Sequence, residues 1–130
     1  MEKAVVVKNT GEKTGKMDQE KTKTYLKNVV ENALNNAQEC IGSLYSTLND
    51  IFDGKGKDTG GKMFQGNRVL HASAGKNISK KSITTFFYED SDTAYIIAIG
   101  QHIDDTSYKL NVYGQNNDNV FKKGSTIKLG

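Results

Sequence analysis

The residues of this chain best suited to acid–base chemistry are its two histidines, His71 and His102. Histidine is the side chain whose unperturbed pKa lies nearest neutrality, so it can take up or release a proton at physiological pH. Cleavage of RNA without a metal requires a base for the 2′-hydroxyl proton, an acid for the departing 5′-oxygen and a cation beside the phosphorane. His71 and His102 can supply the base and the acid, and Lys109 and Arg68 can supply the cation. The sequence therefore contains the minimal set of groups for metal-independent ribonuclease chemistry.

Four further side chains can donate hydrogen bonds to a bound phosphate or base: Thr85, Ser73, Asn111 and Tyr113. Thr85 and Tyr113 are candidates for catalysis, and Asn111 is a candidate for RNA binding. Side chains alternate along a straight strand, so Arg68 and His71 are expected on opposite faces. Both can serve one site only if Arg68 lies in the preceding turn or if a bulge intervenes.

Residues 83–113 are expected to position most of these groups. They contain three runs rich in β-branched and aromatic residues, at 83–89, 94–103 and 107–113, separated by short acidic breaks. Connections this short join antiparallel strands, because parallel neighbours need a long crossover. We therefore predict a three-stranded antiparallel meander.

The faces of the meander depend on where its last turn lies. A chain reversal through residues 104–107 pairs Ile103 with Tyr108 and turns Gln101 and Ile99 toward the core. A one-residue slip would move every side chain to the other face, so this register is testable. The pairs expected on the outward face are His102–Lys109, Gly100–Asn111 and Ala98–Tyr113.

The first 52 residues predict a tail followed by helix. Residues 1–17 show no periodicity and are expected to form a mobile tail, in which residues 5–7 can add a short edge strand. From residue 18 to residue 52, apolar side chains recur every three or four positions, as in an amphipathic helix. Asp18 or Thr22 can cap its start, and Gly42 can bend or split it. One or two helices are therefore expected on the core face of the sheet.

The remaining segments complete a single α+β domain over residues 18–130. Residues 53–62 contain four glycines and no apolar residue, which predicts a flexible joint without phosphate-loop or dinucleotide spacing. Residues 68–73 predict a first strand of the sheet part, 63–130, and residues 120–121 and 125–129 can supply a short closing strand. We expect an N-terminal helix or helix pair packed on one face of a twisted antiparallel sheet of four to five strands.

The charges of this chain are compatible with RNA and indicate no preference for DNA. The formal net charge is +3, and Arg68 is the only arginine among 18 Lys and Arg residues. Lysines cluster at 55–62, 76–81 and 122–128, where they can follow a phosphate backbone or form an ordinary solvated surface. Phe87 is the sheet aromatic that the expected alternation leaves outside the core, so it is a candidate for base stacking. The lysines proposed to bind RNA are Lys76, Lys80 and Lys81.

Other kinds of chemistry find little support in the sequence. Cys40 is the only cysteine and lies in the helical stripe, so neither a disulfide within the chain nor a cysteine nucleophile is expected. One cysteine and two histidines argue against structural zinc, and we expect no metal and no cofactor. Carboxylates gather in turns, which argues against a glycosidase. No apolar run approaches membrane-spanning length and no secretory signal is evident, so membrane anchoring is not expected.

The layout over residues 20–130 resembles the barnase/EndoU/colicin/RelE group of small ribonucleases. The shared features are an N-terminal helical part, a glycine-rich joint and a basic antiparallel sheet with a His/Lys/Arg/Tyr face. The segment VENALNN, residues 30–36, is similar to the VENN sequence that precedes toxin regions in contact-dependent growth-inhibition proteins, with Ala33 in place of the second asparagine. The resemblance implies that the active-site roles fall on His71 or His102, on Arg68 or Lys109, and on Thr85 or Tyr113.

The resemblance also implies a biological setting. It implies a bacterial toxin domain that cleaves tRNA or another RNA without metal and is held inactive by a specific immunity protein. Such a domain would be secreted as part of a larger protein and would act in the cytoplasm of the target cell; otherwise a cytoplasmic protein is expected.

Two other classes of function fit the same sequence. A non-catalytic interaction protein, such as an immunity or adaptor protein, would dock a partner on its sheet and be harmless when expressed alone. An RNA-binding module without cleavage would bind with a steep salt dependence, leave RNA intact and lose affinity over many lysines. Only the ribonuclease would lose cleavage on replacement of both His71 and His102.

Overall fold

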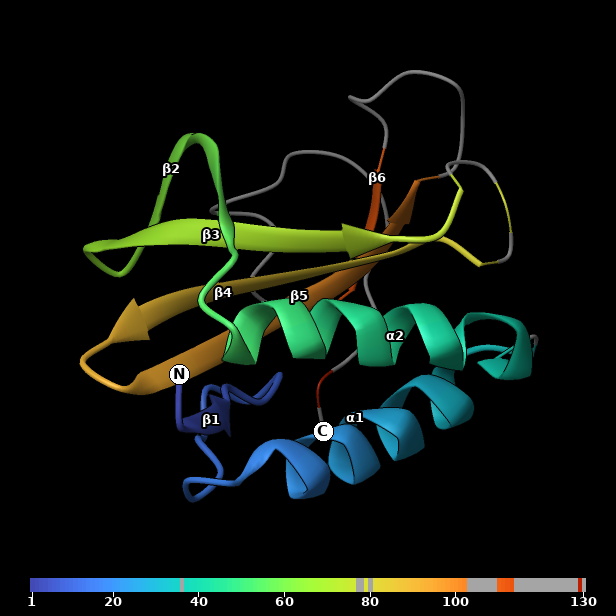
Figure 1. Cartoon of the computed structure of the whole chain (residues 1–130), viewed down its shortest axis with the longest axis horizontal. Coiled ribbons are helices and arrows are strands. Elements are labelled where there is room, and N and C mark those ends of the chain that lie inside the picture. Colours follow the sequence, from blue (N-terminus) through green and yellow to red (C-terminus); the bar gives the residue numbers. More distant parts are fainter. Residues whose placement is uncertain (36, 77–78, 80, 103–109, 114–128, 130) are drawn as a thin grey trace.

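The computed structural model describes residues 1–35, 37–76, 79, 81–102, 110–113 and 129, with residues 110–113 described as a strand only. Within them the chain forms an α+β fold in which two helices precede most of the strands, which confirms the predicted class (Figure 1). Neither helix of this described part is long and apolar enough to cross a membrane. The elements are β1 (Lys3–Val6), α1 (Gln19–Ala33), α2 (Ala37–Phe52), β2 (Lys57–Phe64), β3 (Asn67–Ala74), β4 (Ile83–Asp90), β5 (Thr93–His102) and β6 (Leu110–Tyr113).

The described strands form one mixed sheet of six strands. Its order is β1-β5-β4-β3-β2, and β6 shares with β1 the second edge of β5. β1 runs parallel to β5 beside Thr93 to Ile96, whereas β6 runs antiparallel beside Ile99 to His102. The other neighbours are antiparallel. The sheet is therefore one strand larger than the largest predicted, and the additional parallel pairing comes from the N-terminus.

Residues 1–17 belong to the folded body, so the predicted mobile tail is wrong, whereas the edge strand predicted at residues 5–7 is present as β1, shifted toward the N-terminus. Ala4 and Val6 are fully buried, and Ala4 exchanges two backbone hydrogen bonds of 2.8 Å with Met17. The amino group of Met1 donates to the carbonyl of Phe52 at 3.0 Å. The segment orders because its valines bury apolar surface once β5 offers a free edge. The paired residues of β5 lie 90 positions further along the chain, so sequence periodicity gives no sign of this pairing.

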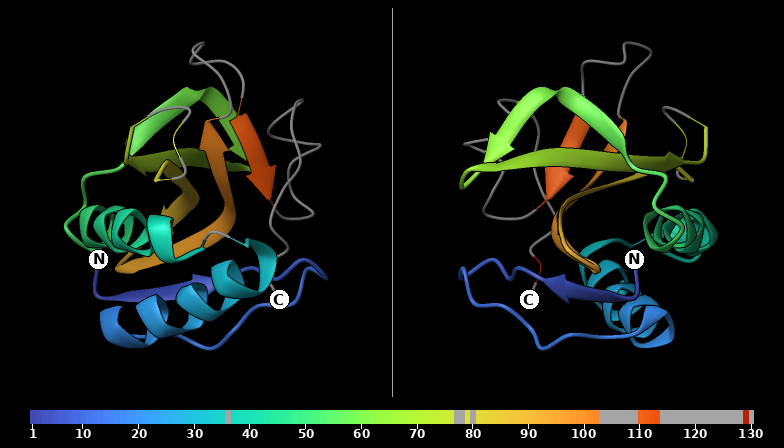
Figure 2. Two further views of the ribbon diagram at one scale, coloured as in Figure 1. Left: turned by 90° about the vertical axis from the view of Figure 1, so that its right-hand side faces the viewer. Right: turned by 60° about the vertical axis from the view of Figure 1, so that its left-hand side comes forward.

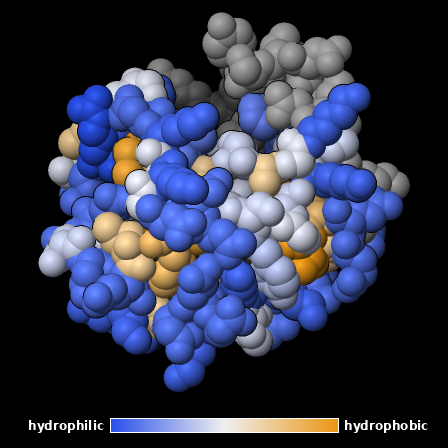
Figure 3. Space-filling view, viewed as in Figure 1, coloured by the Kyte–Doolittle hydropathy of each residue, from blue (hydrophilic) through white to orange (hydrophobic). Residues whose placement is uncertain are grey.

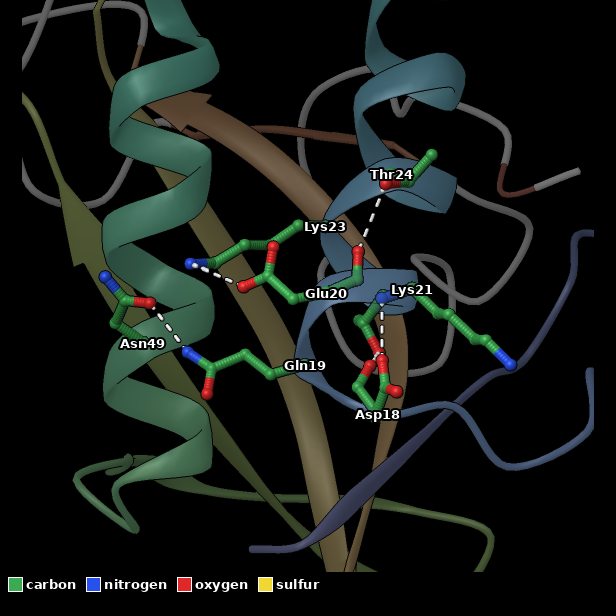
Figure 4. Close-up of polar contacts among 8 residues, drawn as sticks. Asp18, Gln19, Glu20, Lys21, Lys23, Thr24 and Asn49 are labelled. Atoms are coloured by element: carbon green, nitrogen blue, oxygen red, sulfur yellow. Dashed lines mark hydrogen bonds and ion pairs between the residues drawn. The ribbon is translucent and has the colours of Figure 1, made fainter.

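The helical stretch divides into α1 and α2, and its caps follow local chemistry. The carboxylate of Asp18 accepts the N–H of Lys21 at 2.9 Å, which makes Asp18 the N-cap of α1, one of the two predicted caps (Figure 4). The amide of Gln19 donates to Asn49 of α2 at 2.7 Å and ties the helices together. The break falls at Leu34, whose backbone is extended, and Gly42 lies inside α2. An exposed glycine costs a helix only about 1 kcal/mol, which α2 tolerates.

The main core lies between the helices and the sheet. α2 packs on β3 and β4, and α1 packs on α2 and β1 (Figure 1). Gly56, just before β2, passes so close to the ring of Phe87 that a Cβ there would collide with it. The largest fully buried side chains of this core are Leu26, Leu44, Leu48, Ile51, Ile83, Phe87, Ile96, Ile99 and Leu129.

The face of the sheet turned away from both helices, which we call the distal face, carries a second buried cluster. β5 has one extra residue, Ile97, since Phe86 pairs with Ala98 and Phe87 with Ile96. Such a bulge bends the strand and increases its twist, and Figure 2 shows β5 strongly curved with both helices on one side of the sheet. The buried cluster of the distal face comprises Val7, Phe64, Val69, Phe86, Tyr88, Ile97 and Ala98.

Candidate functional site

The structure brings His71 and His102 to the distal face. His71 pairs with Phe86, and Phe86 pairs with Ala98. Directly opposed residues share a face and alternate residues of a strand return to it, so Ala98, Gly100 and His102 point the same way as His71. The rings of His71 and Phe86 lie 6.2 Å apart between centroids. Both histidines are partly exposed, so the distal face is accessible where they lie.

β2 adds to this face two polar groups from the stretch for which the sequence predicts a flexible joint. Lys57 pairs directly with His71, and the hydroxyl of Thr59 lies 3.0 Å from Nδ1 of His71. The signal that could have revealed them is the turn between β2 and β3. Gln65 and Gly66 both have positive φ, 49° and 79°, as in a type I′ hairpin turn. A hairpin there turns part of the joint into a strand beside His71.

The surroundings of His71 favour its neutral form. Burial is the main cause that lowers the pKa of His71 below its ordinary value. The positive charges of Lys57 and of protonated His102 lower it further, and the negative charge of Asp58 opposes them. An imidazole with a lowered pKa is unprotonated near pH 7 and can therefore accept a proton there.

Charge substitutions in β2 are expected to move the pKa of His71 in opposite directions. Lys57→Gln removes a positive charge and should raise this pKa, whereas Asp58→Asn removes a negative charge and should lower it. Titration of the His71 ring protons by NMR measures both shifts. Lys62→Gln, an exposed lysine of the same strand, is the control and should leave the pKa in place. An unchanged pKa in Lys57→Gln would contradict the pairing of Lys57 with His71.

Arg68 lies away from the histidines. It is inside β3, three residues from His71 with no bulge of β3 between them, so its side chain points to the opposite face. Its Nε atom lies 2.6 Å from Oδ1 of Asp58, and the two side chains are 66% and 44% exposed. An ion pair this exposed contributes little to the stability of the fold, because water and salt screen it. The structure therefore replaces Arg68 with Lys57 as the cation beside His71.

Thr85 and Phe87 are buried on the helix side of the sheet, which corrects their predicted roles. Both are 0% exposed. Thr85 pairs with Ile99 and Phe87 with Ile96, so both face the main core. Neither side chain can reach bound RNA from there. The expected alternation assumed that only one face of β4 is buried, whereas its distal face is buried as well.

The hydroxyl of Thr85 links β4 to α2. It lies 2.8 Å from the hydroxyl of Thr47 in α2, which in turn donates to the carbonyl of Leu44 at 2.8 Å. Because the hydrogen of Thr47 is engaged by Leu44, Thr85 is the donor of the pair.

Substitutions in this pair are expected to cost unequal free energies of unfolding. Thr47→Val leaves the buried hydroxyl of Thr85 without an acceptor and should cost about 1–3 kcal/mol. Thr85→Val leaves Thr47 bonded to Leu44 and should cost less than about 1 kcal/mol. The double variant should recover part of the stability lost in Thr47→Val, since no buried donor then lacks an acceptor. Urea denaturation measures all three; a larger loss for Thr85→Val would reverse the assigned donor.

β6 pairs one residue out of the predicted register. The Cα partners are His102 with Leu110, Gln101 with Asn111, Gly100 with Val112 and Ile99 with Tyr113. The expected pairing of His102 with Lys109 is therefore wrong. In a hairpin the loop length sets the register, and the sequence did not show how many residues the turn takes. Lys109 lies outside the described residues, and Asn111 and Tyr113 are described as strand positions alone.

Two of the lysines predicted to bind RNA lie within the described residues. Lys76 and Lys81 are exposed in the segment between β3 and β4. Ser82, which follows Lys81, accepts the backbone N–H of His102 with its hydroxyl at 3.2 Å. The predicted contact residue Lys80, the lysine cluster 122–128 and most of the predicted closing strand lie outside the described residues.

Similarity to known proteins does not assign this site. No family model, curated protein or solved structure matches the chain. Within the part of the chain that the structure describes, no three His, Cys, Asp or Glu side chains are grouped to hold a metal. On the side of the molecule seen in Figure 3, hydrophilic residues dominate and apolar ones appear in small, separate places. The chemistry of the distal face is therefore what indicates a function.

Proposed function

We propose that this chain is a ribonuclease domain that cleaves RNA without a metal. The observation that carries the proposal is the placement of His71 and His102 on one face of one sheet, with Lys57 directly opposite His71. Holding an acid, a base and a cation on a packed sheet removes the entropic cost of assembling them around a phosphodiester. The histidines come from β3 and β5, which are separated by β4. Their position on one face therefore supports a common site more strongly than either histidine alone.

The roles follow from protonation. His71, kept neutral by burial, takes the proton of the 2′-hydroxyl, and the 2′-oxygen attacks the phosphorus. Lys57 stabilises the negative charge of the phosphorane. His102 gives its proton to the 5′-oxygen as the bond from phosphorus to that oxygen breaks. The products are one RNA end with a 2′,3′-cyclic phosphate and one with a 5′-hydroxyl.

Groups outside this trio remain candidates for binding. Lys76 and Lys81 are exposed, and Lys81 precedes Ser82, which bonds to the backbone of His102, so these lysines remain candidates for phosphate contacts. Lys80 and Lys109 keep the roles that the sequence suggests for them. Asn111 and Tyr113 occupy strand positions opposite Gln101 and Ile99, on the other face from His102, so they are no longer proposed as parts of this site.

The biological setting is proposed from the resemblance alone. The layout of helical part, joint and basic sheet supports an antibacterial toxin domain that acts on tRNA and is neutralised by a cognate immunity protein. Its release within a larger secreted protein and its action in the cytoplasm of a target cell belong to the same proposal.

The proposal is tested by incubating the purified chain with tRNA and total RNA in the presence of EDTA. We expect discrete fragments that carry 2′,3′-cyclic phosphates and 5′-hydroxyls, and arrested growth when the chain is expressed in bacteria. Intact RNA with normal growth would favour the interaction protein. Intact RNA with salt-dependent binding would favour the RNA-binding module.

A further inference from the structure

The contact between Thr59 and His71 suggests how the proposed base is oriented. We propose that Thr59 is a positioning residue that holds His71 in the tautomer protonated on Nδ1, so that Nε2 alone meets the 2′-hydroxyl. This inference rests on the proposed function for its catalytic meaning, but the contact itself is structural. The hydroxyl of Thr59 lies 3.0 Å from Nδ1, and both side chains are half-buried.

The irregular part of β2 carries Thr59 to the imidazole. The pairing of β2 with β3 is regular at Lys57 and Asp58 and resumes only at Met63. Gly60 and Gly61 between these points have φ of 58° and 74°, a conformation that glycine adopts without steric cost. The bulge therefore lets one residue of β2 leave the ladder directly beside His71.

Asp58 fixes the bulge with both of its carboxylate oxygens. Oδ2 accepts the N–H of Gly61 at 2.9 Å, and Oδ1 accepts Nε of Arg68 at 2.6 Å. These contacts close the turn over residues 58–61 and anchor it to β3. Arg68, which lies away from the histidines, thus acts on the site through the shape of this bulge.

The chemistry of imidazole decides which tautomer is useful. A threonine hydroxyl can donate to Nδ1 or accept from it. If it donated, the proton of neutral His71 would sit on Nε2, and the nitrogen away from Thr59 could not act as a base. If it accepts, Nε2 keeps a free lone pair. The protonated ring formed after proton transfer still donates Nδ1–H to the same oxygen, so one contact serves both states of the base.

Removal of the hydroxyl is expected to impair turnover more than binding. Thr59→Val keeps the volume of the side chain and removes the acceptor. It should lower kcat about 10-fold to 100-fold with little change in KM, because the ring of His71 is no longer held with Nε2 toward the 2′-hydroxyl. Thr59→Ser restores the hydroxyl and should retain most of the activity. Thr24→Val, the same change on the exposed side of α1, is the control for the substitution and should cleave like the parent chain.

The decisive measurement is the tautomer of His71, read from its ring nitrogen shifts by long-range ¹H–¹⁵N NMR at neutral pH. We expect the Nδ1–H tautomer in the parent chain and in Thr59→Ser, and a mixture in Thr59→Val. The Nε2–H tautomer in the parent chain, or an unchanged tautomer and rate in Thr59→Val, would overturn the inference. If the parent chain does not cleave RNA, the proposed function fails, while the NMR result still decides whether Thr59 orients His71.

Discussion

Replacement of His71 or His102 with alanine is expected to lower kcat/KM for RNA cleavage by roughly 10²–10⁴-fold, because each substitution removes one proton-transfer group. The double variant should lose little beyond the worse single variant, since a base without its acid no longer completes the reaction. Initial rates on a short RNA with one cleavable linkage measure these losses. Lys57→Ala should also slow cleavage, and Lys21→Ala, an exposed lysine of α1, is its matched control and should not.

The pH dependence of kcat/KM separates the two histidines. The base must be neutral, and the pKa of His71 lies below its ordinary value of about 6.5, so the acidic limb should fall below pH 6.5. Lys57→Gln should move this limb to higher pH, because the loss of its positive charge raises the pKa of His71. The alkaline limb should report loss of the proton from His102. An acidic limb that persists unchanged in His71→Ala would assign the base to another residue.

Substitution of Phe87 is expected to have the largest effect on stability. Phe87 is 0% exposed in the main core, and Gly56 packs directly on its ring. Phe87→Ala should therefore lower the free energy of unfolding by about 3–5 kcal/mol through lost burial and a residual cavity. That is a large share of the roughly 5–15 kcal/mol that holds a domain of this size together. Urea denaturation followed by circular dichroism measures the loss.

Met63 provides the contrast on the surface. It is 50% exposed, so Met63→Ala should change the free energy of unfolding by no more than about 0.5 kcal/mol. If Phe87→Ala were as stable as the parent chain but bound RNA more weakly, the ring would be a stacking platform, as its sequence position first suggested. The burial of Phe87 leads us to expect the opposite result.

The sequence by itself determined the helical part, the central strands of the sheet and the class of the fold. Apolar spacing of three to four residues over 18–52 and alternation in residues 83–103 are local signals, because each period comes from the geometry of one helix or one strand. Asp18 was recognisable as a cap from its type and position. The two histidines were recognisable as the candidate acid and base from their chemistry alone.

Tertiary structure decided which side chains meet. A strand repeats every two residues, so its faces depend on register and bulges, and these depend on partners far away in the chain. The bulge at Ile97 and the pairing of Thr85 with Ile99 placed Phe87 in the core. The hairpin of β2 with β3 brought Lys57 and Thr59 to His71, across 12 to 14 residues of sequence. Long-range pairing thus settled the composition of the site, because no local pattern specifies which strand lies beside which.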